Sequence, residues 1–292
     1  MSILLTLALS ASALPSVEDV IKWLPANTET LMVARKAGWL GEMAGELSGA
    51  DEARQLLAIG MGGAETGTAR LEYEFVVNGS RAFKRPKDLG LTPYEGCKII
   101  GMKPAEFKRV QAIFKAGGKK ILVDGQEGYE FSRMMEQDLW KFSVVFVDGL
   151  MLCATDEGYL AEVLKRRGGK RTGRALPESL PQWKFVDQKA PFWVVRQAAS
   201  EVKALDKKLF GYAMTLTSDE KQFRVVSLSK DPKGFEIAKD FWEGFMRQEK
   251  AHPPVVKKLS AEASEVMFAG DGKYEGRLMF MLMGAVGTAV YL

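Results

Sequence analysis

The chain has 292 residues, 47% of them hydrophobic and 27% charged, a composition that excludes a disordered or fibrous protein and predicts about two globular domains. The formal net charge is +4, but six basic residues fall within residues 165–174, a stretch without an acid. Outside this stretch the chain has 35 basic and 37 acidic residues, so the basic character is local and does not indicate a general nucleic-acid-binding protein.

The N-terminus has the pattern of a signal peptide. An apolar run over residues 3–9 is followed by Ala11-Ser12-Ala13, the small-x-small spacing of a signal-peptidase site. We therefore expect a signal peptide over residues 1–13 and a mature protein that is exported to the periplasm or outside the cell. No Lys or Arg precedes the apolar run, so an ordinary first helix is the alternative. The run is too short to span a bilayer.

Strand and helix patterns then alternate along the first half of the chain. Residues 70–77 alternate between apolar and polar side chains, and Asn78-Gly79 after them is typical of a tight hairpin turn. Similar turns are expected at Asp124-Gly125 and Asp148-Gly149. The predicted order is strand, helix, strand, strand, helix, strand, over residues 30–35, 39–57, 70–77, 98–102, 104–115 and 119–123.

The second half repeats this order. Residues 129–154 add hairpins, a helix begins at residue 155, and residues 177–191 form the connection. The six elements of the repeat are expected at residues 192–197, 200–208, 210–217, 222–229, 232–249 and 265–269. We therefore predict an α+β fold of two tandem β-α-β-β-α-β (ferredoxin-like) modules with additional antiparallel hairpins, over residues 14–176 and 177–292.

The last fifteen residues, 278–292, carry no charge. This run is short for a membrane span and contains two glycines, so a buried last strand followed by a docked tail is expected and a membrane anchor is the alternative. We expect no transmembrane span.

Few residues offer catalytic or metal-binding chemistry. Cys97 and Cys153 lie in apolar, strand-like segments and are interpreted as buried free thiols, with a single disulfide as the alternative. His252 is the only histidine, so neither a Ser-His or Cys-His catalytic set nor a histidine-based metal site is indicated. The glycine-rich residues 60–67 follow a helical run and lack the Lys-Ser or Lys-Thr of a P-loop. We expect no cofactor.

Carboxylate pairs leave one enzymatic alternative open. Asp156-Glu157 lies at a helix start, where acids complement exposed N–H groups, and Glu127 and Glu130 flank a turn. These structural roles are sufficient, but a hydrolase with an unrecognised carboxylate site remains the alternative.

Two basic stretches are candidates for contact with a polyanion or an anionic membrane surface. The stretch within residues 165–174 also suits the end of a helix, and the stretch within residues 81–87 also protects an exposed sheet edge from pairing. The candidate residues are Arg81, Lys84, Arg85, Lys87, Lys165, Arg166, Arg167, Lys170, Arg171 and Arg174.

Residues 174–187, which read Arg-Ala-Leu-Pro-Glu-Ser-Leu-Pro-Gln-Trp-Lys-Phe-Val-Asp, are followed by Ala190-Pro191-Phe192-Trp193. Together with residues 24–30, 93–97, 154–164 and 289–292, this sequence resembles a bacterial family of uncharacterised exported proteins. The resemblance covers most of the chain in order. It implies export and supplies no catalytic residue.

The expected function is therefore non-enzymatic binding or a structural role in the cell envelope. The expected partner is an envelope protein or a polyanionic component, and sequence-specific nucleic-acid binding is not expected.

Overall fold

The structure is a computed structural model. It describes residues 14–35, 72–82, 94–135, 138–154, 157–169, 175–197, 211–216, 222–228, 233–236, 238–240, 243 and 255–269.

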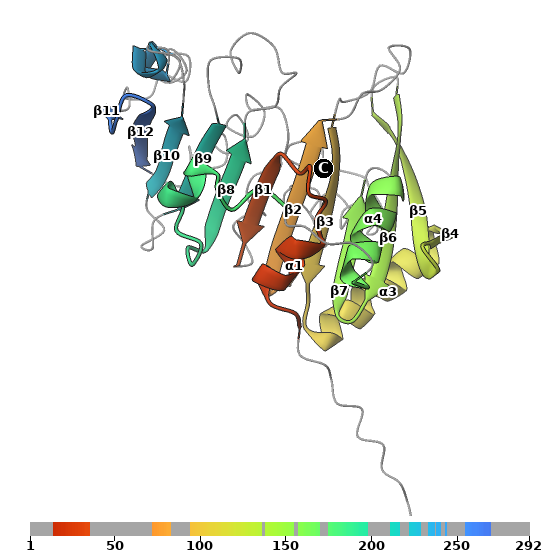
Figure 1. The fold of residues 1–292 in the computed structure, drawn as a ribbon. Coiled ribbons are helices and arrows are strands. Elements are labelled where there is room, and N and C mark those ends of the chain that lie inside the picture. The colour runs from red at the N-terminus through yellow and green to blue at the C-terminus, as the bar shows by residue number, and fades with distance from the viewer. Residues whose placement is uncertain are drawn as a thin grey trace, which may run out of the picture.

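The described strands form one twelve-stranded antiparallel sheet with the order β11-β12-β10-β9-β8-β1-β2-β3-β7-β6-β5-β4 (Figure 1). The first described strand, β1, lies in the middle of this sheet, and the described strands of each half of the chain extend outward from the central β1·β8 pair. The strands are β1 Thr30–Ala34, β2 Phe75–Ala82, β3 Tyr94–Gly101, β4 Lys119–Val123, β5 Gln126–Met135, β6 Asp138–Val147, β7 Leu150–Ala154, β8 Phe192–Gln197, β9 Gly211–Leu216, β10 Gln222–Leu228, β11 Val256–Lys258 and β12 Ala263–Ala269.

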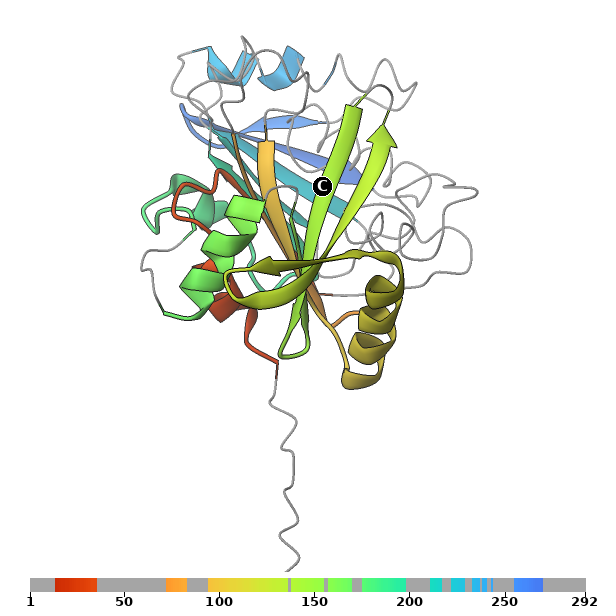
Figure 2. The ribbon, with the colours of Figure 1, turned by 90° about the vertical axis from the view of Figure 1, so that its right-hand side faces the viewer.

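Among the described helices, α1 and α4 cover one face of the sheet, which we call the helix face (Figure 2). In α1 (Val17–Trp23) the apolar residues Val17, Val20 and Ile21 follow helical spacing, and Ser16 caps the helix by accepting a hydrogen bond from the backbone N–H of Asp19. The apolar side of α4 (Glu157–Arg167) joins the same core, which includes Leu31 in β1. A 3₁₀ helix, η3 (Pro181–Phe185), contacts β8, β9 and β10.

The opposite face of the sheet carries α3 (Pro104–Gly117) near its β4 end (Figure 2). The ring centres of Phe107 and Phe146 lie 5.7 Å apart, and those of Phe114 and Phe131 lie 5.0 Å apart; both pairs pack edge to face. The chain passes from β3 through α3 to the edge strand β4 and returns through β5 and β6 to β7, which pairs with β3. This insertion accounts for the extra hairpins expected over residues 129–154.

The α+β class and the antiparallel sheet are confirmed, but tandem ferredoxin-like modules are not. A split β-α-β unit leaves room for another strand between the two strands that a helix connects. Here β1 pairs directly with β2, and β8 pairs directly with β9. The two expected modules also share one sheet through the β1·β8 pair, and the boundary drawn between residues 176 and 177 lies between α4 and η3.

Local turn signals have mixed outcomes. Asp124-Gly125 and Asp148-Gly149 form the expected hairpin turns, and all four residues have positive φ. The turn expected at Asn78-Gly79 is wrong, because both residues lie inside β2 and pair with β1 and β3. Gly79 lies close to Leu24: a Cβ would lie 2.6 Å from Leu24 Cδ1, so any larger residue there would require Leu24 to shift.

Candidate functional site

The two cysteines point to opposite faces of the sheet. Cys97 in β3 lies opposite Ala154 of β7, whereas Cys153 of β7 lies opposite Lys98. Both are buried free thiols, as expected, and a disulfide between them would require one strand to turn over. Burial raises the pKa of Cys97 well above its usual value and that of Cys153 to about 12, so neither is an activated nucleophile.

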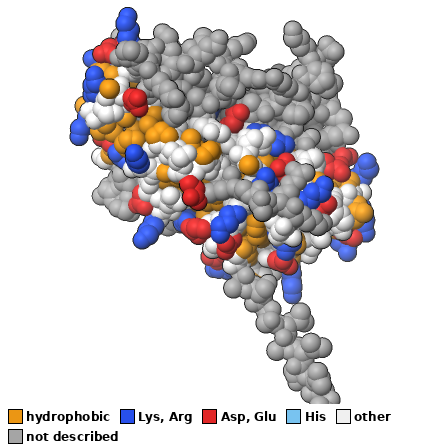
Figure 3. Space-filling model, in the orientation of Figure 1, with side chains coloured by type: hydrophobic (Ala, Val, Ile, Leu, Met, Phe, Trp, Pro, Cys, Tyr) orange, Lys and Arg blue, Asp and Glu red, His pale blue; other side chains and the backbone are white. Residues whose placement is uncertain are grey.

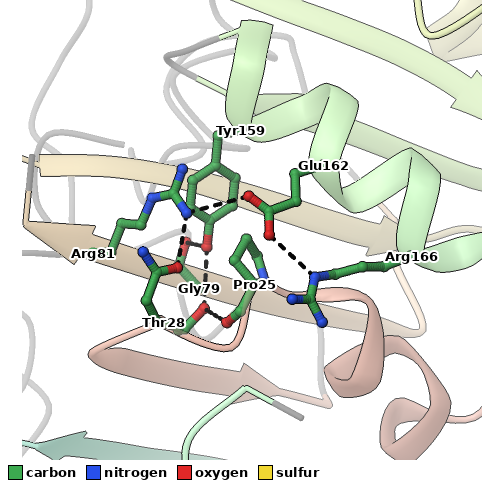
Figure 4. A network of polar contacts seen from close by, with 8 residues as sticks. Pro25, Thr28, Gly79, Arg81, Tyr159, Glu162 and Arg166 are labelled. Carbon is green, nitrogen blue, oxygen red and sulfur yellow. Dashed lines mark hydrogen bonds and ion pairs between the residues drawn. The ribbon is translucent and has the colours of Figure 1, made fainter. Parts of the chain in front are cut away.

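Two of the basic candidates meet on the helix face at one acid of α4 (Figure 4). Arg81 Nη1 lies 3.3 Å from Glu162 Oε2, and Arg166 Nε lies 3.3 Å from Glu162 Oε1. Arg81 also donates to Asn27 Oδ1 at 2.8 Å. The carboxylate of Glu162 thus joins a guanidinium from β2 to one from its own helix.

Tyr159 extends this network into the core (Figure 4). Its hydroxyl donates to the carbonyl oxygen of Gly79 at 3.3 Å and lies 3.3 Å from Thr28 Oγ1, which donates to the carbonyl of Pro25 at 2.6 Å. The guanidinium of Arg81 lies 4.7 Å from the centre of the Tyr159 ring. Burial raises the pKa of Tyr159. We call Glu162, Arg81, Arg166, Tyr159 and Thr28 the α4 clamp, because they fix α4 to β2 and to the turn before β1.

Two further basic candidates on α4 also have acids beside them. Lys165 Nζ lies 3.9 Å from Asp124 Oδ1, and Arg167 bonds Asp148 while its guanidinium lies 5.9 Å from the Trp23 ring centre. Figure 3 shows acidic and basic side chains interspersed on the helix face. The remaining candidates, Lys84, Arg85, Lys87, Lys170, Arg171 and Arg174, lie outside the described residues.

The carboxylate pair in β5 does not converge. Glu127 Oε2 lies 2.5 Å from Lys120 Nζ, and Glu127 Oε1 accepts a hydrogen bond from the hydroxyl of Tyr129. Glu130 is an odd number of residues away, so it projects from the other side of the strand, where it contacts Lys119 Nζ at 3.4 Å. These two acids therefore cannot act on one substrate bond.

Most of the other candidate residues from the sequence analysis lie outside the described residues. Glu157 is exposed in the first turn of α4. Asp156, His252 and residues 60–67 lie outside the described residues. Within the described residues, no group of three or more His, Cys, Asp or Glu side chains is placed to hold a metal ion. No described helix is both long enough and apolar enough to cross a bilayer.

The structure reveals a buried polar row that sequence reasoning missed. Asn78 of β2, Lys98 of β3 and Cys153 of β7 are cross-strand partners in turn, so their side chains share the face of the sheet opposite the helix face. Their exposed fractions are 3%, 1% and 2%. We call these three residues the Lys98 row.

A second polar row runs beside it on the same face. Thr30 of β1 pairs with Ser80 of β2 and with Arg196 of β8, and all three are buried. Thr30 is two residues from Met32, the β1 partner of Asn78, which places the two rows side by side. We call the Lys98 row and this Arg196 row together the polar face.

The electrostatics of the Lys98 row are unusual for a protein interior. Burial lowers the pKa of Lys98 well below its usual value, against a smaller opposing effect of the neighbouring thiol of Cys153. Within the part of the chain that the structure describes, Asn78 Oδ1 is buried and accepts no hydrogen bond. Buried polar atoms are ordinarily hydrogen-bonded, so Asn78 Oδ1 is an exception within this row.

The sequence does contain one signal for this site. Lys98 stands within Gly96-Cys97-Lys98-Ile99-Ile100, where a strand that is buried on both faces reads as a continuous apolar run. A lysine inside such a run indicates a buried amine. Recognising it requires knowing that β3 is central, with β2 on one side and β7 on the other.

Comparison with known proteins identifies the fold only. No protein-family model and no curated protein matches the sequence. The structure is similar to crystal form I of TP0453, with a TM-score of 0.52 and 10% sequence identity over 93% of this chain and 98% of that chain. Crystal form III of TP0453 aligns with a TM-score of 0.49, 10% identity and coverage of 94% and 99%. The resemblance to exported bacterial proteins stays a prediction.

Proposed function

We propose that this protein is a non-enzymatic binding protein that holds a small ligand against the polar face. The observation that carries the proposal is the burial of Lys98 beside Asn78 in the middle of a sheet whose interior is otherwise largely apolar. An ammonium group and an amide are costly to bury, and convergent polar groups within an apolar surround are characteristic of ligand sites.

The chemistry of the candidate groups supports binding over hydrolysis. The acids Glu127 and Glu130 project from opposite sides of β5 and are held by different lysines. The thiol of Cys153 is the nucleophilic group beside Lys98, and its raised pKa keeps it protonated at neutral pH. The row therefore offers hydrogen-bonding groups, and the two acids of β5 are not part of it.

Native mass spectrometry of the protein purified from its host tests this proposal. We expect the wild-type protein to carry a ligand that adds a defined mass, and Lys98→Met to lose it. Lys119→Met is the matched control, because Lys119 lies on the edge strand β4 with an exposed side chain. The absence of any adduct on the wild type, or an equal adduct on Lys98→Met, contradicts the proposal.

We place this function in the cell envelope, on the support of the signal-peptide pattern before residue 14. Cleavage after Ala13 is the expected processing step. Mass spectrometry of the mature protein from the native host checks it, and a chain that still begins at Met1 or Ser2 contradicts it.

A second candidate function is contact with a polyanionic envelope component through the ten basic residues proposed from the sequence. What favours it is that Arg81, Lys165, Arg166 and Arg167 all lie around α4 on the helix face. Each also has an acid beside it, which weakens its attraction for an external anion. A heparin column tests this candidate. Retention that weakens as salt is added, and that is lost in the double variant Lys165→Glu, Arg167→Glu, supports it. Passage without retention at low salt excludes it.

A further inference from the structure

The strand β4 forms one end of the twelve-stranded sheet, and no described strand lies on its outer side (Figure 1). We infer that this edge binds a second copy of the chain, with β4 of one copy pairing antiparallel with β4 of the other. The inference concerns the edge of the sheet and does not depend on a ligand at the polar face.

Leu122 in β4 gives this edge an exposed apolar side chain. Its exposed fraction is 68%, and among the described residues the other exposed large hydrophobic residue is Val255, at 82%. A side chain of this size on an edge strand is a site at which another strand can add, because pairing covers the side chain and the backbone together.

The lysines of β4 do not guard the edge with unbalanced charge. Edge strands are commonly protected by lysines, and Lys119 and Lys120 both have exposed side chains. The ammonium group of Lys119 lies beside Glu130 of the neighbouring strand β5, and that of Lys120 lies beside Glu127. The charge of the two lysines is therefore balanced within the same chain.

The backbone of β4 directs hydrogen-bonding groups to its outer side. Asp124-Gly125 form the turn between β4 and β5, and Val123 pairs with Gln126 across it. In a two-residue hairpin this flanking pair is hydrogen-bonded, and hydrogen-bonded pairs alternate along an antiparallel ladder. Lys120 and Leu122 therefore direct their N–H and C=O groups away from β5, toward a strand that joins the edge.

The sequence of β4 is complementary to itself, which selects a second copy as the occupant. An antiparallel pair can be centred on Ile121, which then lies opposite Ile121 of the other copy. Each Lys120 lies opposite a Leu122, and each Lys119 lies opposite a Val123. Lysine never faces lysine in this register, and every residue of the strand has a partner.

The acids and the turn of this hairpin favour the same register. Glu127 is the β5 partner of Leu122, so Lys120 of the second copy continues a cross-strand row that begins with an acid. A pair centred on Lys120 would instead place two lysines opposite each other. A pair centred on Leu122 would place Lys120 opposite Asp124, whose positive φ takes it out of the strand.

Sedimentation velocity of the purified protein over a range of concentrations tests the inference. A single pair of strands is a small interface, so we expect a weak dimer whose fraction rises with concentration. Leu122→Lys places lysines opposite each other twice, and we expect it to weaken the dimer by about tenfold or more. Val255→Lys is the matched control, because Val255 is also exposed but lies outside β4, and it should associate as the wild type does.

Disulfide crosslinking tests the register. Ile121→Cys places the two introduced cysteines directly opposite each other, so we expect a symmetric crosslink under mild oxidation. Leu122→Cys is the control, because its cysteines are diagonal neighbours about 7 to 8 Å apart, beyond the usual span of a disulfide. The native thiols of Cys97 and Cys153 are buried and do not compete.

Several results contradict the inference. They are a monomer at every concentration, equal association of Leu122→Lys and the wild type, loss of association in Val255→Lys, and faster crosslinking of Leu122→Cys than of Ile121→Cys. Leu122 is exposed, so Leu122→Lys leaves the core intact, and thermal unfolding checks that each variant is folded. None of these results changes the mass of a bound ligand, so native mass spectrometry tests the proposed function separately.

Discussion

Replacement of Glu162 by Gln tests the central interaction of the α4 clamp. The substitution keeps the size of the side chain and removes the charge that holds Arg81 and Arg166. The side chain of Arg166 is 6% exposed, and those of Arg81 and Glu162 are 17% exposed. Removing one partner of a fully buried pair costs about 3 to 5 kcal/mol, whereas a surface pair contributes about 0 to 1 kcal/mol. With this residual exposure, we expect a loss of about 2 to 3 kcal/mol in the free energy of unfolding.

Urea denaturation of the purified protein measures this loss directly. A change of this size lowers the melting temperature of a chain of this length by roughly 5 to 10 °C. Glu18→Gln is the matched control, because Glu18 pairs with Arg35 at the same 3.3 Å but is 62% exposed. We expect the control to change stability by less than about 0.5 kcal/mol.

A double-mutant cycle then assigns the loss to the ion pairs. Arg166→Met and Glu162→Gln should be less costly together than the sum of their separate effects, because each removes the same contact. Equal stability of Glu162→Gln and the wild type, or strict additivity in the cycle, would refute the conclusion that the α4 clamp stabilises the fold.

Four other outcomes follow from the structure. As the pH rises toward 10.5, the usual pKa of lysine, the wild type should gain stability relative to Lys98→Met, by up to about 1.4 kcal/mol per pH unit. The reason is that the lowered pKa of Lys98 leaves the unfolded state with more bound protons than the folded state below that pH, and urea titrations at each pH measure the gain. Tyr159→Phe should cost about 1 kcal/mol in the same assay, because the carbonyl of Gly79 loses a buried donor. Gly79→Ala should destabilise by about 1 to 3 kcal/mol, since its Cβ would lie 2.6 Å from a Leu24 methyl carbon. Cys97 and Cys153 should react with a thiol reagent only after unfolding, and non-reducing peptide mapping of the oxidised native protein should show no bridge between them.

The sequence alone predicted features that depend on neighbouring residues in the chain. The helix expected to begin at residue 155 is α4, and its residues Leu160, Val163 and Leu164 follow helical spacing and are buried. Asp124-Gly125 and Asp148-Gly149 indicated tight turns because the required positive φ angles are set locally. The α+β class and the antiparallel pairing follow from such local signals.

The arrangement of the strands depended on contacts between distant segments. Asn78-Gly79 has the composition of a turn, yet pairing with β1 on one side and β3 on the other keeps it extended. The order of strands was also misjudged, because a helical segment between two strands does not reveal whether those strands become neighbours. Backbone pairing over many residues outweighs the preference of a two-residue turn.

The position of the candidate site was decided by the tertiary structure. Lys98 reads in the sequence as a lysine within an apolar run, and Asn78 reads as part of a turn. Only the register of β2, β3 and β7 places the two side chains next to each other on a buried face. Burial and neighbouring charge, rather than residue type, determine whether an amine is a solvated surface group or a buried group with a lowered pKa, and both depend on the tertiary structure.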